Sequence, residues 1–225
     1  MKIDFLWTGG WDSTFRIIQL YNRGLTIQPI YIVDQSRKSH KKEIETIYLL
    51  TEQINIRFKN YGGKILPLEL IQKKEIKNSI YLKLVFKLLR KFNKVRIGKQ
   101  YYWIACLSHD RKISLEECFI KVNRNSLIPL NETTEIIDET GEINWIVNPK
   151  KMPFLKRQIF KNMRFPLIYT SKIEMRDFAE KNNFLDLMNK TWFCHESGIE
   201  PCGECIPCKQ YIKDGFGNRV KKQSV

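Results

Sequence analysis

A strand, a glycine turn and a helix start follow one another within residues 3–21, and this unit constrains the fold more than any other stretch. Residues 3–7 are mainly apolar and predict a short buried strand, and residues 15–21 carry apolar side chains at helical spacing. Between them, the Thr-Gly-Gly of residues 8–10 predicts a turn, and the Asp-Ser-Thr of residues 12–14 supplies helix-capping side chains. Such a corner binds anions, because unpaired helix amides and the helix dipole favour negative charge. A purely structural turn is the alternative.

Strands and helices continue to alternate after this unit. Thr26–Val33 is an apolar run typical of a parallel strand buried on both faces, Lys42–Lys59 has an amphipathic helical pattern, and Ile65–Leu70 predicts a third strand. The short connections predict right-handed crossovers, and therefore an α/β fold with a doubly wound, Rossmann-like parallel sheet. The further elements expected are helices at Ile80–Phe92 and Gly98–Leu107 and a fourth strand at Lys112–Phe119.

The alternation breaks at about residues 131–148. Two short apolar runs on either side of Gly141 predict a β-hairpin inserted into the α/β domain. Helices resume afterwards, and the one expected at Glu174–Lys181 is capped by Thr170 or Ser171; with Ser171, Glu174 would complete a capping box. We expect an α/β domain over residues 1–190 and a metal-binding segment over residues 191–225.

That last segment holds four of the six cysteines: Cys194, Cys202, Cys205 and Cys208. Two interlocking C-x-x-C steps turn successive thiolates toward one centre, which predicts a structural Zn²⁺ site. An iron–sulfur cluster and disulfides are the alternatives that thiols at this spacing allow. Four thiolates leave no place for His195 as a ligand, and we expect Cys106 and Cys118 to be small core residues.

The composition and the net charge limit the kinds of binding partner and the cellular location that we expect. No run approaches 18 uninterrupted apolar residues, and the first residues lack the pattern of a signal peptide, so we expect a cytoplasmic protein that does not bind membranes. The formal net charge is +15, spread along the chain. This charge suits a polyanion such as tRNA or DNA, but it equally suits the phosphates of a nucleotide or a lysine-rich surface, and we do not favour nucleic acid.

The hydroxyl-Gly-Gly-x-Asp-Ser pattern of residues 8–13 resembles the Ser-Gly-Gly-x-Asp-Ser loop of the PP-loop ATP pyrophosphatases, with Thr8 in place of serine. Residues 190–208 resemble the C-terminal signature of the 7-cyano-7-deazaguanine synthases (QueC-like proteins), with Phe193 in place of serine. Pro166 and Lys172 are similar to that family's Pro…Thr-Lys element. The resemblance covers both ends of the chain, covers residues 70–150 poorly, and implies a Rossmann-like fold of the HUP type.

The resemblance implies a site for ATP, with Mg²⁺ held partly by Asp12. The residues expected to bind the nucleotide are Thr8, Gly9, Gly10, Trp11, Asp12, Ser13, Thr14, Val33 and Asp34. The residues expected to take part in catalysis are Asp12, Ser13 and Lys172, and Lys172 would neutralise phosphate charge.

The implied reaction is adenylation of the carboxylate of 7-carboxy-7-deazaguanine and its transfer to ammonia, which gives the amide and then the nitrile. Three other hypotheses stay open: a related ligase that conjugates a deazaguanine to a protein or peptide amine in a defence system, a tRNA-modifying PP-loop adenylase, and a non-catalytic nucleic-acid-binding zinc module. A homodimer is compatible with each.

Overall fold

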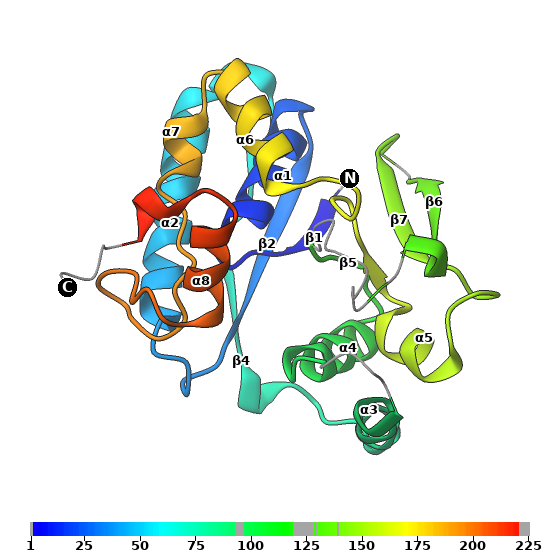
Figure 1. Ribbon diagram of the computed structural model, residues 1–225. Helices are drawn as coiled ribbons and strands as arrows, with labels where there is room; N and C mark the ends of the chain where they lie inside the picture. Colours follow the sequence, from blue (N-terminus) through cyan, green and yellow to red (C-terminus); the bar gives the residue numbers. More distant parts are fainter. Residues whose placement is uncertain (1, 93–96, 119–127, 129, 139, 221–225) are drawn as a thin grey trace.

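A computed structural model describes residues 2–92, 97–118, 128, 130–138 and 140–220 (Figure 1). Its centre is a parallel sheet with the strand order β3-β2-β1-β5-β8, and β4 also pairs with β2. The strands are β1 (Lys2–Leu6), β2 (Thr26–Val33), β3 (Lys64–Ile65), β4 (Glu69–Gln72), β5 (Leu115–Glu116) and β8 (Met163–Arg164). The predicted doubly wound α/β sheet is confirmed.

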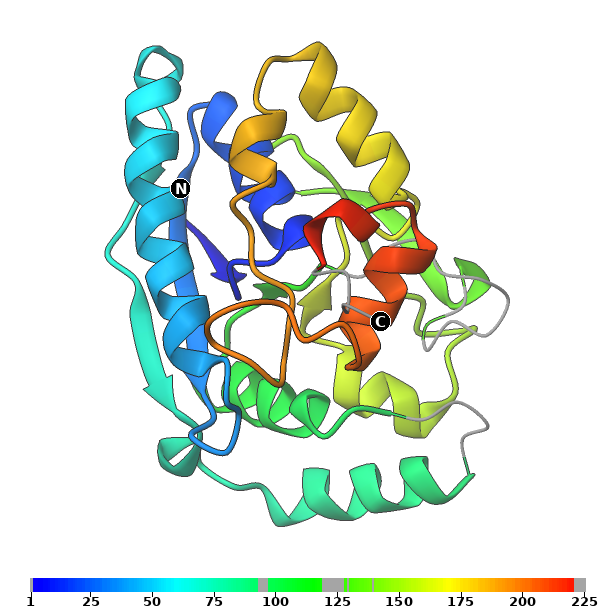
Figure 2. The ribbon, with the colours of Figure 1, turned by 60° about the vertical axis from the view of Figure 1, so that its left-hand side comes forward.

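Helices cover both faces of this sheet (Figures 1 and 2). They are α1 (Trp11–Asn22), α2 (His40–Arg57), α3 (Ile80–Phe92), α4 (Gln100–Arg111), α5 (Phe154–Phe160), α6 (Lys172–Lys181), α7 (Leu185–Met188) and α8 (Ile206–Lys213). Short 3₁₀ turns lie at Lys59–Tyr61, Lys73–Glu75, Leu130–Glu132 and Gly217–Arg219. One hydrophobic cluster joins the sheet to α1, α2, α6 and α7, and a second joins it to α3, α4 and α5. No helix in the described ranges is both long enough and apolar enough to cross a membrane.

Two of the predicted strands differ from the observed ones. The strand expected over Ile65–Leu70 is split into β3 and β4 at Pro67, which has no N–H to donate to a ladder. The strand expected over Lys112–Phe119 is only Leu115–Glu116, because Lys112 adopts a left-handed conformation (φ 54°) that ends α4. Phe119 lies outside the described residues.

The start of α1 also differs from the prediction. The helix begins at Trp11 with Gly10 as its N-cap, so residues 12–14 lie inside the first turn and none of them caps it. The hydroxyl of Ser13 donates to the carbonyl of Gly10 instead. At α6 the capping prediction is confirmed, since Ser171 and Glu174 form a capping box. The uncapped amides of α1 therefore remain available to a ligand.

The predicted hairpin is present as β6 (Thr133–Ile137) and β7 (Ile143–Val147), and it is tied to the main sheet by buried charges. Arg16 of α1 donates to both carboxylate oxygens of Glu116 on β5 (2.9 and 3.1 Å) and to Glu142 at the hairpin (3.0 Å). Asn144 bridges Glu116 and Asp138. Burial disfavours the charge of Arg16, but the two glutamates raise its pKa above the ordinary value. The hairpin is therefore docked on α1 and β5.

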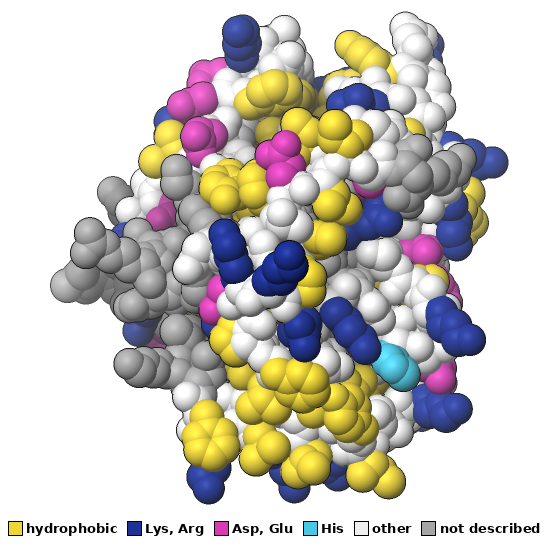
Figure 3. Space-filling view, turned by 90° about the vertical axis from the view of Figure 1, so that its right-hand side faces the viewer, with side chains coloured by type: hydrophobic (Ala, Val, Ile, Leu, Met, Phe, Trp, Pro, Cys, Tyr) yellow, Lys and Arg dark blue, Asp and Glu magenta, His cyan; other side chains and the backbone are white. Residues whose placement is uncertain are grey.

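The lysine and arginine side chains are dispersed over the surface. On the face shown in Figure 3, hydrophobic side chains gather in the lower part, and lysine and arginine side chains are scattered around them. Helix α3 buries Leu82, Val85 and Phe86 but exposes Ile80 and Leu84 to solvent. The described surface on this side thus mixes apolar and basic groups.

Candidate functional site

The loop at residues 8–10 is shaped by contacts on both of its sides. Gly9 has φ +67°, and a Cβ there would lie 3.1 Å from the side chain of Thr46 and 3.2 Å from the carbonyl of Glu43, so the position requires glycine. The backbone N–H of Trp192 donates to the carbonyl of Gly9 (2.9 Å). The indole of Trp7 donates to Thr14 (3.1 Å) beneath the loop. These contacts hold the amides at the start of α1 toward open space.

Asp12 and Lys172 are 160 residues apart in sequence and meet at this loop. The ammonium of Lys172 donates to Asp12 Oδ1 at 2.5 Å, and its side chain is largely buried. Although burial disfavours its charge, Asp12 and Tyr211 raise the pKa of Lys172. The lysine is therefore a fixed positive charge beside the carboxylate at the first turn of α1.

Two cavities meet at the loop. The larger, about 510 Å³, opens along the carboxyl ends of β2, β1 and β5, where ligands collect in open α/β sheets. The smaller, about 300 Å³, lies between the loop and the C-terminal segment and contains Lys172 and Tyr211. Both cavities are lined by Thr8, Gly10, Trp11, Asp12, Arg37 and His195. The loop thus forms the common wall of a continuous site.

The structure separates the residues expected to bind nucleotide into two groups. Those that line the larger cavity are Thr8, Gly10, Trp11, Asp12, Ser13 and Asp34. Gly9, Thr14 and Val33 do not line either cavity: Gly9 and Thr14 make the loop contacts given above, and Val33 is buried in the core. Lys172 lines the smaller cavity.

At the carboxyl end of β2, Asp34 is held by its neighbours. Its carboxylate accepts from Lys73 (2.8 Å) and from the hydroxyl of Ser36 (2.7 Å). Burial alone would raise the pKa of Asp34, but these bonds lower it below the usual value. Nearby, Tyr31 donates to buried Glu43, which also pairs with Arg37 (2.9 Å). This end of the cavity is therefore rigid and polar.

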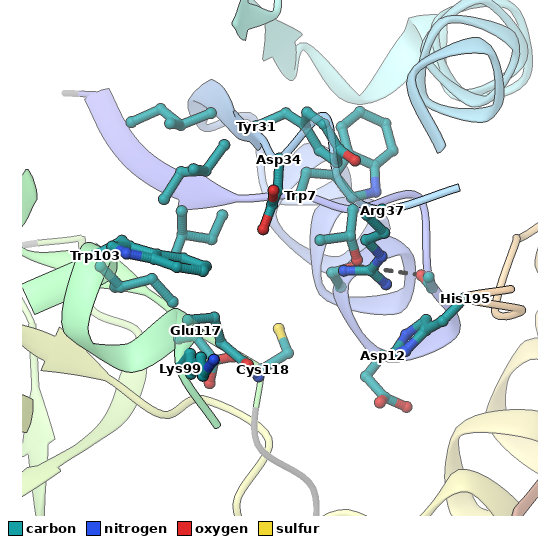
Figure 4. Close-up of a pocket in the computed structure, with 18 of the residues that line it drawn as sticks. Trp7, Asp12, Tyr31, Asp34, Arg37, Lys99, Trp103, Glu117, Cys118 and His195 are labelled. Carbon is teal, nitrogen blue, oxygen red and sulfur yellow. Dashed lines mark hydrogen bonds between the residues drawn. The ribbon is translucent and has the colours of Figure 1, made fainter. Parts of the chain in front are cut away.

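Sequence reasoning missed the opposite wall of the larger cavity. Lys99, Gln100 and Trp103 reach it from the start of α4, and Glu117 and Cys118 follow β5 directly. In Figure 4 the labelled side chains of Lys99, Trp103, Glu117 and Cys118 lie across the cavity from Arg37 and His195. The sequence contained no signal for Glu117 and Cys118, because the expected strand Lys112–Phe119 enclosed them, whereas β5 ends at Glu116 and leaves both at the carboxyl end of a parallel strand, where ligands collect.

The expectation that Cys118 is a small core residue is confirmed only in part, because the side chain packs against the hydrophobic cluster of β1 and α1 but also faces the larger cavity. The side chain is partly exposed and lines the cavity, because Cys118 lies beyond the end of β5 at Glu116. Burial raises the pKa of the Cys118 thiol well above its ordinary value, with Glu116 and Glu117 adding to the effect. The sulfur is therefore a neutral thiol and not an activated nucleophile.

The four C-terminal cysteines converge as the spacing predicts. The Sγ atoms of Cys194, Cys202, Cys205 and Cys208 all lie within 4.8 Å of one another, and the closest pairs are 3.4 to 3.9 Å apart. Four sulfurs about 2.3 Å from one Zn²⁺ would lie about 3.8 Å apart, so the donor set fits this ion. Within the part of the chain that the structure describes, the cluster consists of these four cysteines and does not include His195. The cluster could hold zinc without large rearrangement.

The cysteine segment packs directly on the loop. Trp192 donates its indole N–H to the carbonyl of Cys194 (2.7 Å), and its backbone N–H holds Gly9. The guanidinium of Arg219 lies 5.4 Å from the ring centre of Trp11. Figures 1 and 2 show this segment, in orange and red, beside the blue start of α1. A metal bound at the cysteines would therefore stabilise the residues that hold the loop.

Comparison with known proteins finds partial similarities. No protein-family model matches the chain. Over 84 residues, the chain is 33% identical to the 7-cyano-7-deazaguanine synthases of Campylobacter jejuni subsp. doylei and Campylobacter jejuni subsp. jejuni. The match covers 33% of this chain and 36% of each relative, so it spans about a third of their length. Among solved structures, a 4-thiouridine synthetase–RNA complex with bound ATP aligns with a TM-score of 0.42 and 14% identity, over 97% of this chain and 50% of that chain.

Proposed function

We propose that this chain is an ATP-dependent ligase that adenylates the carboxylate of 7-carboxy-7-deazaguanine and transfers it to an amine. The observation that carries the proposal is the loop at residues 8–13, which presents uncapped helix amides and the Asp12–Lys172 pair where two cavities meet. The similarity to 7-cyano-7-deazaguanine synthases over part of the chain supports the substrate class.

The proposed nucleotide position follows from the charges around the loop. The phosphates of ATP would accept hydrogen bonds from the amides at the start of α1, with Lys172 balancing their charge from the smaller cavity. The adenosine would extend toward Asp34 at the end of β2. Mg²⁺ is a hard cation that prefers oxygen ligands, and Asp12 is the carboxylate placed to bind it.

The proposed chemistry needs positioning and charge neutralisation more than a protein nucleophile. An oxygen of the substrate carboxylate attacks the α-phosphorus, an acyl–phosphate bond forms, and the bond to pyrophosphate breaks. The amine then attacks the acyl carbon and releases AMP. Fixed amides and Lys172 would stabilise the charge that develops on the phosphates. The neutral thiol of Cys118 is consistent with direct attack by the substrate.

The test is to incubate zinc-loaded protein with ATP, Mg²⁺ and 7-carboxy-7-deazaguanine, with and without ammonium, and to measure AMP and products by mass spectrometry. AMP together with the amide or nitrile is the expected result. AMP without either product would redirect the search to a protein or peptide amine. Absence of AMP above a control that lacks the carboxylate would contradict the proposal.

A further inference from the structure

The larger cavity has two ends, which lie on either side of β1. The chain runs from β1 to β2 on one side of the sheet and later crosses to β5 on the other, so the carboxyl ends of β1 and β5 flank the point where strand order reverses. Successive side chains of a strand point to opposite faces. Glu116 accordingly enters the buried network with Arg16, and Glu117 lines the cavity.

Glu117 differs from the other carboxylates of this cavity. Asp12 is paired with Lys172, and Asp34 is paired with Lys73. By contrast, Oε2 of Glu117 is buried and has no hydrogen-bond partner among the described residues, while its backbone N–H donates to the carbonyl of Arg164 (2.9 Å). Burial, together with the charge of Asp12, raises the pKa of Glu117 to about 8. At neutral pH Glu117 is therefore mostly protonated in the ligand-free chain, and a ligand that donates hydrogen bonds to both oxygens would stabilise the ionised carboxylate and lower its pKa.

A flat aromatic side chain lies on the same side of the cavity. The indole of Trp103 projects toward the middle of the space in Figure 4, on the side of Glu117. Its ring is held by the ammonium of Lys73, which lies 3.7 Å from the ring centre and also binds Asp34. A planar ring packed on Trp103 would present its edge to nearby polar groups.

We propose that Glu117 determines substrate specificity by accepting hydrogen bonds from two adjacent N–H donors of a planar heterocycle that packs against Trp103. The two oxygens of a carboxylate match two parallel donors, as in bidentate pairs with guanidinium groups. In a 2-amino-4-oxo pyrimidine ring, such as that of a deazaguanine, the ring N–H and the exocyclic amino group supply this pair. This inference rests on the proposed function and assigns the part of the substrate that the enzyme distinguishes.

The test compares two ligands that differ in one amino group, 7-deazaguanine and 7-deazahypoxanthine, by calorimetry on the full-length zinc-loaded protein without ATP. The wild type is expected to bind 7-deazaguanine about 10- to 100-fold more tightly, because the other ligand lacks one donor. In Glu117→Gln the ratio should fall to near one, since an amide offers only one acceptor oxygen. Glu52→Gln, the same change at an exposed residue of α2, should keep the wild-type ratio.

Either an unchanged ratio in Glu117→Gln or equal binding of the two ligands by the wild type would overturn the inference; so would binding of neither. The wild-type ratio stands as a test even if the variant does not fold. The outcomes also separate this inference from the proposed function. A Glu117-dependent preference without AMP formation from the carboxylate would refute only the adenylation. AMP formation with an unchanged preference in the variant would refute only the role of Glu117.

Discussion

Asp12 and Lys172 form an ion pair beside the loop. When phosphates bind, the ammonium of Lys172 would have to leave the Asp12 carboxylate and contact a phosphate oxygen instead. At the scale of single residues, this pair is the sharpest indicator of chemistry. In the proposed reaction Asp12 holds Mg²⁺, whereas in the ligand-free chain it balances the lysine. The two roles can be separated by removing the charge of Asp12 and keeping its shape.

Asp12→Asn should lower AMP formation by about 100-fold or more, which is the usual effect of removing a group that stabilises charge in the transition state. The variant should still fold with a lowered melting temperature, because the amide oxygen can accept from Lys172 but no longer balances its buried charge. AMP release and thermal unfolding would be measured side by side. The prediction fails if AMP formation stays near wild type in a folded variant.

The raised pKa of Glu117 predicts a pH-dependent stability. The pKa of about 8 in the folded chain lies above the ordinary 4.5, so the folded state binds the proton more tightly than the unfolded state. Stability should therefore fall as pH rises from about 4.5 to 8. In Glu117→Gln this pH-dependent loss of stability is absent. The melting temperature of the variant relative to the wild type should therefore rise between pH 5 and pH 9. A constant difference across that range would contradict the assignment.

At the scale of elements, buried charge joins α1, β5 and the hairpin. Arg16→Met leaves Glu116 and Glu142 buried without their main partner, and should cost about 3–5 kcal/mol of unfolding free energy. Arg23 also pairs with Glu142, but its side chain is 57% exposed, so Arg23→Met should cost less than about 1 kcal/mol. Urea denaturation would compare the two variants. Equal losses of unfolding free energy in the two variants would mean that burial does not set how much the Arg16 ion pairs contribute to stability.

The cysteine segment offers a second element to test. Cys205→Ser should lower zinc content and melting temperature together, because the remaining three thiolates no longer close the site. Cys106→Ser changes a buried cysteine outside the cluster and should keep one zinc per chain. Metal analysis and thermal unfolding of both variants would check this. Unchanged zinc and stability in Cys205→Ser would exclude the cluster as a metal site.

The sequence allowed prediction of features encoded by local patterns. The alternation of β1, α1 and β2, the capping box at Ser171 and the convergence of the cysteines follow from neighbouring residues, and the structure contains each. The features that could not be predicted depend on contacts between residues that are distant in sequence. A single sequence does not reveal that Glu116 pairs with Arg16, which lies 100 residues away. It also does not reveal that Glu117 lines a cavity. The division into two domains at residue 190 stays a prediction.

At the scale of the whole molecule, the two ends of the described chain form one structure. Residues 192–194 belong to the same hydrophobic cluster as β1 and α1, as do Cys208, Tyr211, Phe216 and Val220. The backbone N–H of Trp192 also donates to the carbonyl of Gly9. The metal cluster and the loop are thus linked through packing and hydrogen bonds, although no cysteine of the cluster lines either cavity.

Removal of zinc should therefore weaken ATP binding by about tenfold or more, within the usual range of coupling between two sites. Because such coupling is reciprocal, ATP should slow the loss of zinc to a chelator. Calorimetry on metal-loaded and chelated protein would measure the first effect, and a colorimetric chelator the second. Identical ATP affinity in both forms would show that the two sites are independent.

The hydrogen bond from Trp192 to Gly9 also has a consequence for biosynthesis. A ribosome produces the loop well before it produces Trp192, which lies far downstream in the sequence. A nascent chain that ends before Trp192 carries the loop without the contact that holds its carbonyl. We expect such a chain to bind no nucleotide, so the site would be completed only after Trp192 has been added.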